Sequence, residues 1–258
     1  MNPVWKIYRL LKNKLPKSTI KKLRVLIESQ TDFLWRKESY SQFGEDGVLM
    51  GMLEARNWNS ALQRSGLNGK GFYVDVGAFS PKQFSNTYLF YKKGWHGINI
   101  DATPGSMKAF RKIRKRDINI EAAVSDTNHE LTFYTWGVHE LTNTFSPEHA
   151  EEFTKAFGKE PEKVVLKTQR LEDILDANLP KNQSIDFMSV DAENHNLEVL
   201  RSNNWEKYRP TYLIVELDDI KKNITDISQS DIVTFMEQHG YHLRSWVDIN
   251  LFFERDSF

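Results

Sequence analysis

The chain has 258 residues, of which 35 are lysine or arginine and 35 are aspartate or glutamate, so its formal net charge at pH 7 is zero. Without an excess of positive charge, the composition gives no support to nucleic acid as the main partner. The chain contains no cysteine, which excludes disulfides, thiolate zinc sites and a cysteine nucleophile. Its length and its hydrophobic fraction of 40% are typical of one large folded domain, alone or with an appendage.

The N-terminal segment is basic and amphipathic. Residues 1–24 contain eight lysines and arginines and no acid, and apolar residues with helical spacing are Val4, Trp5, Tyr8, Leu11 and Leu15. Such a helix either lies on an anionic membrane surface or packs on the folded domain with its lysines in solvent. The segment lacks the apolar core of a signal peptide, and the chain has no run of 18 apolar residues to span a membrane. We expect a cytoplasmic protein with a basic helical extension over residues 1–39, which on the first interpretation contacts the inner face of the membrane through residues 1–24.

Two further helices are expected before the central part of the chain. Pro16 ends the first helix, and Ser18 is expected to cap a second one that runs from Thr19 to about Ser29. The segment YSQFGEDGVL at 40–49 leads into the next helix, because acids in a first turn favour a helix start. A polar loop rich in Asn, Ser and Gly follows at 57–70.

The stretch 71–101 has the order of a nucleotide-binding unit. An apolar run at 72–76 ends on Gly77, a helical stretch follows, and a second apolar run ends on Asp101. Glycine allows a sharp turn and close approach to a ligand, the next helix would point its N–H groups at that ligand, and the acid can accept the hydroxyl hydrogens of a ribose. One glycine stands where the dinucleotide fingerprint has three, so an ordinary buried strand with a turn glycine is the alternative.

Strands and helices alternate through the rest of the chain. The expected helices are Pro104–Arg116, Glu148–Phe157, Leu171–Ala177, Asn196–Ser202 and Ser230–His239. The expected strands are Ile118–Val124, Leu131–Trp136, Lys163–Thr168, Ile185–Val190 and Thr211–Leu217, followed by a hairpin of Tyr241–Trp246 and Ile249–Glu254. This order predicts an α/β fold with a mostly parallel sheet, helices on both faces and a C-terminal antiparallel hairpin.

Polar residues stand at the carboxyl ends of the expected strands, namely Asp75, Asp101, Ser125, Asp126, Asp191 and Glu216. Ligands of parallel sheets bind beyond this edge. We therefore expect these side chains to converge on one site.

The sequence resembles the FkbM family of S-adenosylmethionine-dependent methyltransferases. The segments that carry the resemblance are YSQFGEDGVL at 40–49, FYVDVGAFSP at 72–81, SNTYLFYKKGWHGINID at 85–101, AVSD at 123–126, IDFMSVDAENHNLEVLRSNNWEKYRP at 185–210 and YLIVEL at 212–217. The resemblance implies a Rossmann-like methyltransferase fold with a sheet of about seven strands. It also implies a methyltransferase domain over residues 40–258, with S-adenosylmethionine as cofactor.

The resemblance further implies which residues bind the cofactor: Tyr40, Gln42, Asp75, Gly77, Ala78, Asn86, Thr87, Asp101, Ala102, Ser125, Asp126 and Asp191. Among these, Asp75 and Gly77 would approach the methionine part of the cofactor, and Asp101 would accept its ribose hydroxyls. Ser125 and Asp126 would border the adenine.

The remaining implied roles concern the methionine end of the cofactor. Asn86 and Thr87 would hold its carboxylate or cap the following helix. Tyr40 and Gln42 would close the site, and Asp191 would lie near the amino group and the reacting methyl.

The family pattern D-x-E-G is altered, because Asn194 stands in place of its glycine. Asparagine tolerates a left-handed backbone, so we expect the turn to survive. Methyl transfer to a hydroxyl requires alignment and a group that draws off the proton, and the candidates are Asp191, Glu193 and His195. In the alternative interpretation, His195 is a surface histidine at a helix start, and Glu193 favours that start.

A magnesium site is a further hypothesis. Asp191 ends one strand, while Glu216 and Asp218 end the next one, so their carboxylates could share one Mg²⁺. Ordinary surface acids after a strand are the alternative.

Acceptor choice is expected to lie in the insertion 131–168, which carries Trp136, His139, Asn143 and Phe145. Aromatic and amide side chains suit a sugar or another polyol, as well as an ordinary packed loop. The family resemblance implies O-methylation of a hydroxyl on a sugar, a glycan or a related small molecule.

Two other functions stay open. A non-catalytic cofactor-binding or scaffold domain in a glycan-synthesis complex fits the departure at Asn194, although Asp75, Gly77, Asp101 and Asp191 are intact. An NAD-dependent oxidoreductase fits less well, because a pyrophosphate needs closer backbone approach than one glycine permits.

Overall fold

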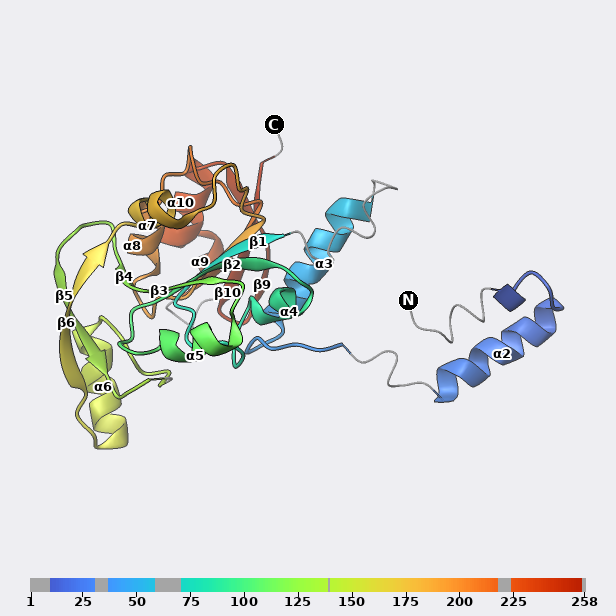
Figure 1. Ribbon diagram of the computed structural model, residues 1–258, viewed down its shortest axis with the longest axis horizontal. Helices are drawn as coiled ribbons and strands as arrows, with labels where there is room; N and C mark the ends of the chain where they lie inside the picture. The colour runs from blue at the N-terminus through green and yellow to red at the C-terminus, as the bar shows by residue number, and fades with distance from the viewer. Residues whose placement is uncertain (1–9, 31–36, 59–70, 139, 218–223, 257–258) are drawn as a thin grey trace. The chain divides into compact units, whose positions relative to one another are not determined.

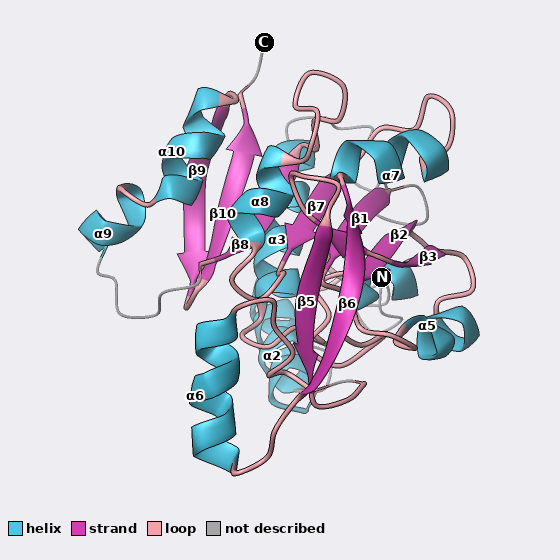
Figure 2. Cartoon of the chain, turned by 90° about the vertical axis from the view of Figure 1, so that its left-hand side faces the viewer, coloured by secondary structure: helices cyan, strands magenta, loops and turns pink. Residues whose placement is uncertain are grey.

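The computed structural model describes residues 10–30, 37–58, 71–138, 140–217 and 224–256. The chain divides into two compact units, Met1–Glu38 and Ser39–Phe258. Most of their helices and strands are labelled in Figure 1, and β7 and β8 are labelled in Figure 2.

The first unit contains helix α2, Lys17–Gln30. Its first turn closes with a hydrogen bond from the backbone N–H of Ile20 to the carbonyl of Pro16 (3.0 Å). The prediction of Ser18 as the cap is wrong, because Pro16 already starts the turn and Ser18 lies inside it.

The expected first helix lies mostly outside the described residues, which begin at Leu10. The helical face of Val4, Trp5 and Tyr8 therefore stays a prediction. Within the described ranges, no helix is long and apolar enough to cross a membrane.

The second unit is built on a seven-stranded sheet with the order β3-β2-β1-β7-β8-β10-β9. Its strands are β1 Phe72–Val76, β2 His96–Asp101, β3 Ile118–Glu121, β7 Phe187–Val190, β8 Tyr212–Glu216, β9 Tyr241–Val247 and β10 Asn250–Arg255. The first five of these run parallel, and β10 is antiparallel to both β8 and β9. The expected mostly parallel sheet with an antiparallel C-terminal hairpin is confirmed (Figure 1).

Strand β1 lies where the order of the strands in the sheet reverses. It lies between β2 and β7 and is buried along its whole length. The register places the carboxyl ends of these three strands at the same level, so Gly77, Asp101 and Asp191 come together there. Parallel sheets bind their ligands at such a reversal of strand order.

Helices cover both faces of the sheet (Figures 1 and 2). One face carries α7 Leu171–Asn178, α8 Asn196–Arg201, α9 Ile224–Ser228 and α10 Asp231–Gln238, and the other carries α3 Glu45–Trp58 and α4 Tyr88–Lys92. Because side chains alternate along a strand, β1 contributes to both cores. Phe72, Val74 and Val76 pack with the first group of helices, and Tyr73 packs with the second.

The C-terminal hairpin turns at Asp248 and Ile249, one residue later than expected. Strand β10, the last strand in the sequence, lies between β8 and β9. Its first residue, Asn250, donates a buried hydrogen bond from Nδ2 to Glu45 Oε1 (2.8 Å). The hairpin is thereby tied to the start of α3.

The segment expected as one strand, Ile118–Val124, is two strands. β3 ends at Glu121, and β4, Ala123–Val124, belongs to a second sheet with the order β4-β6-β5. The chain leaves the main sheet at Ala122, whose N–H donates to the carbonyl of Asp101 (3.0 Å). The stretch INIEAAV at 118–124 contributes to two sheets, because the residue pattern of a strand does not reveal a change of pairing partner.

The helix expected from Pro104 to Arg116 is shorter and is α5, Met107–Ile113. Gly105 has φ +85° and cannot be part of a helix. At the other end, Arg114 leaves helical geometry with φ −103° and ψ 55°. The residues around Pro104 form a turn instead.

The insertion consists of β5 Glu130–Thr135, α6 Pro147–Phe157 and β6 Glu162–Gln169. β5 and β6 form an antiparallel pair, which lies at the front in Figure 2. Helix α6 starts where Ser146 Oγ accepts a hydrogen bond from the N–H of His149 (3.2 Å), and it ends at Gly158 with φ +65°.

Candidate active site

A cavity of about 250 Å³ lies at the carboxyl ends of β1, β2 and β7. The predicted site residues that line it are Gln42, Gly77, Asp101, Ala102, Asp191, Glu193 and Glu216. The insertion contributes Phe133, Glu140, Leu141, Asn143 and Phe145. The structure therefore brings strand ends and insertion together around one cavity.

Gly77 forms the turn after β1 with φ +78°, a left-handed conformation that glycine adopts without strain. Its N–H donates to the carbonyl of Ile100 (2.9 Å). A Cβ built on Gly77 would lie 1.6 Å from the carbonyl oxygen of Asp191. Glycine is therefore required by the close approach of the β7 end, in addition to any approach of a ligand.

The Asp101 carboxylate is held in a fixed orientation. Oδ2 accepts the N–H of Phe79 (2.9 Å), and Oδ1 accepts the N–H of Thr103 (2.8 Å). Each carboxylate oxygen has a second lone pair, for which the side chains of Thr103 and Ser106 compete with a ligand hydroxyl. Burial raises the pKa of Asp101, and the two backbone N–H groups oppose this.

The Asp191 carboxylate has an unsatisfied oxygen. Its backbone N–H donates to the carbonyl of Val76 (2.9 Å), which fixes the end of β7 against β1. Oδ1 is buried and has no hydrogen-bond partner within the part of the chain that the structure describes. Such an acceptor is costly to leave unpaired, so it fits a ligand that brings a donor.

Asp75 lies behind the cavity and does not line it. Thr87 Oγ1 donates to Asp75 Oδ2 (2.7 Å). Burial raises the pKa of Asp75 to about 6, while the Thr87 hydrogen bond and the charge of Arg114 lower it, and the charges of Asp191 and Asp117 raise it. Arg114, which the sequence prediction missed, is fully buried.

The other residues expected at the methionine end are mostly used within the protein. Asn86 Nδ2 donates to Ser189 Oγ (3.0 Å) on β7. Thr87 precedes α4, but its side chain does not cap that helix. Tyr40 is not among the lining residues, and its hydroxyl accepts from Lys92 Nζ (2.7 Å).

Ala78 also points away from the cavity. Its side chain packs with Met107 and Phe110 in a small separate core. Its backbone N–H donates to Ile100 (3.0 Å), so it supports the turn through its main chain.

Ser125 and Asp126 lie away from the cavity, because the chain changes sheets at Ala122. Ser125 is buried, and its Oγ lies 3.0 Å from His195 Nε2. Ala122 and Val124 line the cavity instead.

His195 is likewise not among the lining residues. Its Nδ1 lies 3.7 Å from Glu198 Oε2, and its ring lies 5.5 Å from that of Phe145. Burial lowers the pKa of His195, although nearby Glu198 and Asp126 oppose this.

The turn after β7 is left-handed at two consecutive residues, Glu193 with φ +47° and Asn194 with φ +68°. The prediction that asparagine would keep the turn is confirmed. The insertion contacts this turn, because Thr144 Oγ1 donates to the carbonyl of Glu193 (3.2 Å) and the Asn194 amide contacts His149 Nδ1. The altered position of the family pattern thus connects the turn to α6.

The structure describes two of the three acids that the sequence suggests as magnesium ligands. Asp191 and Glu216 line the same cavity, whereas Asp218 lies outside the described residues. Among residues that the structure does describe, no group of three or more histidine or acidic side chains could hold a metal ion.

Within the insertion, Asn143 and Phe145 line the cavity as expected. Trp136 does not, because its Nε1 donates to the carbonyl of Lys159 (2.9 Å), and His139 lies outside the described residues. Sequence prediction missed the aromatic residues Phe79 and Phe84, whose rings stack at 6.2 Å and which both have positive φ. Phe79 directly follows the expected glycine turn, and this position was the available signal.

Comparison with known proteins agrees with this architecture. The family model of the methyltransferase FkbM domain matches residues 75–243, from Asp75 through the insertion to β9. No curated protein matches the chain. The match includes Gly77, Asp101, Asp191 and the turn at Asn194, and the protein belongs to the FkbM methyltransferase family.

Proposed function

We propose that this methyltransferase uses S-adenosylmethionine and methylates a hydroxyl of a sugar, a glycan or a related small molecule. The observation that carries the proposal is that Asp101 and Asp191 line one cavity beside Gly77. The braced Asp101 carboxylate suits a ribose diol, and the unpartnered Oδ1 of Asp191 suits a cationic donor. The cofactor carries both groups, a ribose diol and an ammonium.

The bound cofactor would supply a methyl group on a positively charged sulfur. The protein's own task is then to hold the cofactor and to align an acceptor oxygen. Glu193 and Asp191 line the cavity and are our candidates for taking the proton of that oxygen. His195 would position the turn through Ser125 and Phe145, since it is not a lining residue.

The acceptor class rests on the mixed lining of the cavity. Gln42, Asn143 and Glu193 offer hydrogen-bonding groups, and Phe145 offers an aromatic surface. Apolar and aromatic walls with a few polar groups suit a polyol ring. Magnesium has no role in this proposal.

The first test is calorimetric titration with S-adenosylmethionine, S-adenosylhomocysteine and NAD. We expect micromolar binding of the first two and none of NAD. Asp101→Ala should weaken binding by about tenfold or more, because hydrogen bonds to a charged group are strong. The exposed Asp173→Ala on α7 is the matched control and should bind as the wild type does.

The same titration separates the alternatives. Binding of NAD alone would favour an oxidoreductase. Binding of the adenosyl ligands without transfer of labelled methyl to any sugar acceptor would favour a cofactor-binding scaffold. Transfer that persists in EDTA would exclude an essential magnesium ion.

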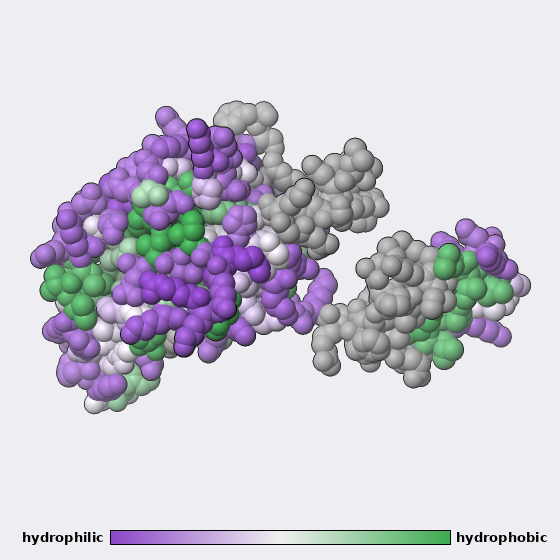
Figure 3. Space-filling model, viewed as in Figure 1, coloured by the Kyte–Doolittle hydropathy of each residue, from purple (hydrophilic) through white to green (hydrophobic). Residues whose placement is uncertain are grey.

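We also propose that the basic N-terminal segment contacts an anionic membrane surface. In α2, the exposed Val25 and Leu26 each lie one turn after a lysine, Lys21 and Lys22. Figure 3 shows hydrophobic side chains of this unit grouped together beside hydrophilic ones. This pattern suits an interfacial helix, with lysines near lipid phosphates.

Flotation with liposomes tests this contact. Vesicles with anionic lipid should retain the protein at low salt, and neutral vesicles should not. A double variant, Lys21→Glu with Lys22→Glu, should release it. Equal retention on both vesicle types, or none, would contradict the electrostatic contact.

A further inference from the structure

Arg114 is a fully buried cation at the end of α5. Its Nε donates to Asp117 Oδ2 (2.8 Å), and both side chains of this ion pair are shielded from solvent. Its guanidinium lies 4.9 Å from the centre of the Tyr91 ring and 5.4 Å from that of Tyr73. Burial of an ion pair costs desolvation free energy. The other contacts of Arg114 and Asp117 therefore show which interactions offset this cost.

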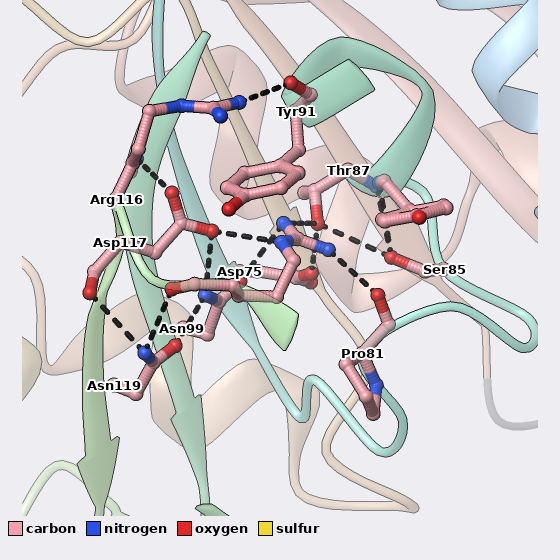
Figure 4. Close-up of polar contacts among 12 residues, drawn as sticks. Asp75, Pro81, Ser85, Thr87, Tyr91, Asn99, Arg116, Asp117 and Asn119 are labelled. Atoms are coloured by element: carbon pink, nitrogen blue, oxygen red, sulfur yellow. Dashed lines mark hydrogen bonds and ion pairs between the residues drawn. The ribbon is translucent and has the colours of Figure 1, made fainter. Parts of the chain in front are cut away.

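The Asp117 end of the network is anchored in the sheet. Asp117 Oδ1 accepts the N–H of Gly97 (3.1 Å), and Oδ2 accepts from the Tyr73 hydroxyl (2.7 Å) and from Asn99 Nδ2 (3.0 Å). Figure 4 shows Asp117 with Asn99 and Asn119 on one side of the network. These contacts fix the position of Asp117, the ion-pair partner of Arg114.

The other end of the network holds the segment that starts at Gly77. Arg114 Nη1 donates to the carbonyl of Pro81 (3.1 Å), and Nη2 donates to Thr87 Oγ1 (2.8 Å). Pro81 and Thr87 belong to the connection between β1 and α4, and Figure 4 shows Thr87 next to Asp75. Arg114 therefore fixes this connection at two points.

Thr87 extends the network to Asp75. The Thr87 hydroxyl accepts from Arg114 and donates to Asp75 Oδ2 (2.7 Å). Only a hydroxyl can do both at one atom. Asp75 in turn lies near Asp191, whose unpartnered oxygen belongs to the cavity.

We infer that Arg114 is a positioning residue for cofactor binding, which acts through Thr87 on Asp75 and through Pro81 on the turn that lines the cavity. The inference rests on the proposed use of S-adenosylmethionine. Neither Arg114 nor Asp75 needs to touch the cofactor. Ionised Asp75 adds negative charge behind Asp191, and the fixed connection keeps Gly77 and Phe79 in place.

The electrostatics of Asp75 support this arrangement. Its pKa of about 6 reflects burial, opposed by Thr87 and Arg114 and assisted by Asp191 and Asp117. Removal of the Thr87 hydroxyl or displacement of the Arg114 charge should therefore raise this pKa further. Affinity for an adenosyl ligand whose ammonium lies near Asp191 should fall as the pH is lowered through the pKa, because protonated Asp75 carries no charge.

The test measures the dissociation constant of S-adenosylhomocysteine from about pH 5.5 to about pH 8, together with the melting temperature. Arg114→Lys keeps the charge but lacks the fork that reaches Pro81, Thr87 and Asp117 together. Thr87→Val removes only the hydroxyl, and Thr87→Ser retains it. Both Arg114→Lys and Thr87→Val should weaken binding about tenfold near neutral pH and shift the pH midpoint upward.

Val74→Ala is the structural control. Val74 is fully buried on the opposite face of β1, so this change leaves the contacts of Arg114 with Pro81 and Thr87 in place. We expect a lower melting temperature with an unchanged dissociation constant and pH midpoint. Thr87→Ser should restore wild-type affinity.

Two results would overturn the inference while leaving the proposed function intact. In one, the wild type binds and Arg114→Lys binds equally well with the same midpoint. In the other, Val74→Ala weakens binding as much as Arg114→Lys for a similar loss of melting temperature, which would make the network purely structural. A wild type that binds no adenosyl ligand at any pH would instead contradict the proposed function, and the inference with it.

Discussion

The two faces of β1 are built by alternate residues of one strand, yet they differ in kind. Phe72, Val74 and Val76 pack among apolar side chains, where contacts are non-directional. Tyr73 and Asp75 belong to the polar network of Arg114, where each contact has a direction and a partner. The first face therefore supplies stability, whereas the second fixes the orientation of the turn beside the cavity.

The largest effect on both stability and ligand binding is expected from a substitution at Gly77, which follows the end of β1. In Gly77→Ala the new methyl would lie 1.6 Å from the Asp191 carbonyl, at a φ of +78°. We expect the free energy of unfolding to fall by more than about 3 kcal/mol and binding of S-adenosylhomocysteine to be lost. Thermal unfolding followed by circular dichroism, with parallel titration, measures both.

Gly51→Ala is the control for that substitution. Gly51 lies in α3, where an added Cβ meets nothing within 4 Å. The helix should gain about 0.5 to 1 kcal/mol, and binding should be unchanged. Wild-type stability and binding in Gly77→Ala would show that β7 can retreat from the turn.

The polar face of β1 should make the free energy of unfolding depend on pH. The pKa of Asp75 is about 6 in the folded protein against an ordinary 3.8, so the folded state binds the proton more tightly. Ionised Asp75 therefore costs stability at neutral pH, by up to about 3 kcal/mol, and this cost disappears as the pH falls through 6 toward 3.8. Asp75→Asn should raise the free energy of unfolding near neutral pH and remove this pH dependence.

Urea unfolding at about pH 4.5 and about pH 7.5 measures the difference. The exposed Asp173→Asn should leave the wild-type pH dependence intact. A less stable Asp75→Asn near neutral pH would mean that the ionised carboxylate is net stabilising as a partner for Arg114.

A substitution on the apolar face of β1 should change the stability of the protein but not its affinity for the ligand. Val74 is fully buried, and Val74→Ala should lower the free energy of unfolding by about 2 kcal/mol through lost burial and a small cavity. The dissociation constant of S-adenosylhomocysteine should stay within about twofold, because the change is non-directional and remote from the cavity. A tenfold loss of affinity would remove the distinction between the two faces.

The smallest effect on stability is expected at Asn194, in the turn after the neighbouring strand β7. Asn194→Gly accepts φ +68° without strain but loses the contact with His149. Stability should change by less than about 1 kcal/mol, while hydrogen exchange of residues 143–149 should become faster, as mass spectrometry would show. Asn194→Val, which cannot easily adopt this φ, should be clearly less stable. Unchanged exchange in Asn194→Gly would mean that the side chain does not hold the insertion.

The sequence could predict those parts whose signal is local. The apolar run of β1, the glycine after it and the acid at the end of β2 lie in one stretch of chain, and the structure has them where expected. The left-handed turn at Asn194 was also predictable, because that preference belongs to the residue itself.

Two of the expected residues that do not line the cavity, Ser125 and Asp126, follow a change of sheets. The sequence predicts Ile118–Val124 as one strand of the main sheet, whereas the chain leaves that sheet at Ala122. From this stretch, Ala122 and Val124 line the cavity.

Arg114 could not be predicted at all. Its partner Asp117 is three residues away, whereas Tyr73 comes from β1 and Pro81 and Thr87 come from the connection between β1 and α4. No spacing in the sequence marks Tyr73, Pro81 and Thr87 as neighbours of Arg114, because the fold brings these distant residues to it.

The place of β10 also has a consequence for synthesis. On the ribosome β1, β2 and β3 emerge early and can pair with one another, whereas β8 has its second neighbour only once β10 has been made. Until then the nascent chain carries an open strand edge, and Glu45 lacks the donor that Asn250 provides. The sheet therefore closes only after translation of its last strand, and until then its open edge is exposed to pairing with other chains.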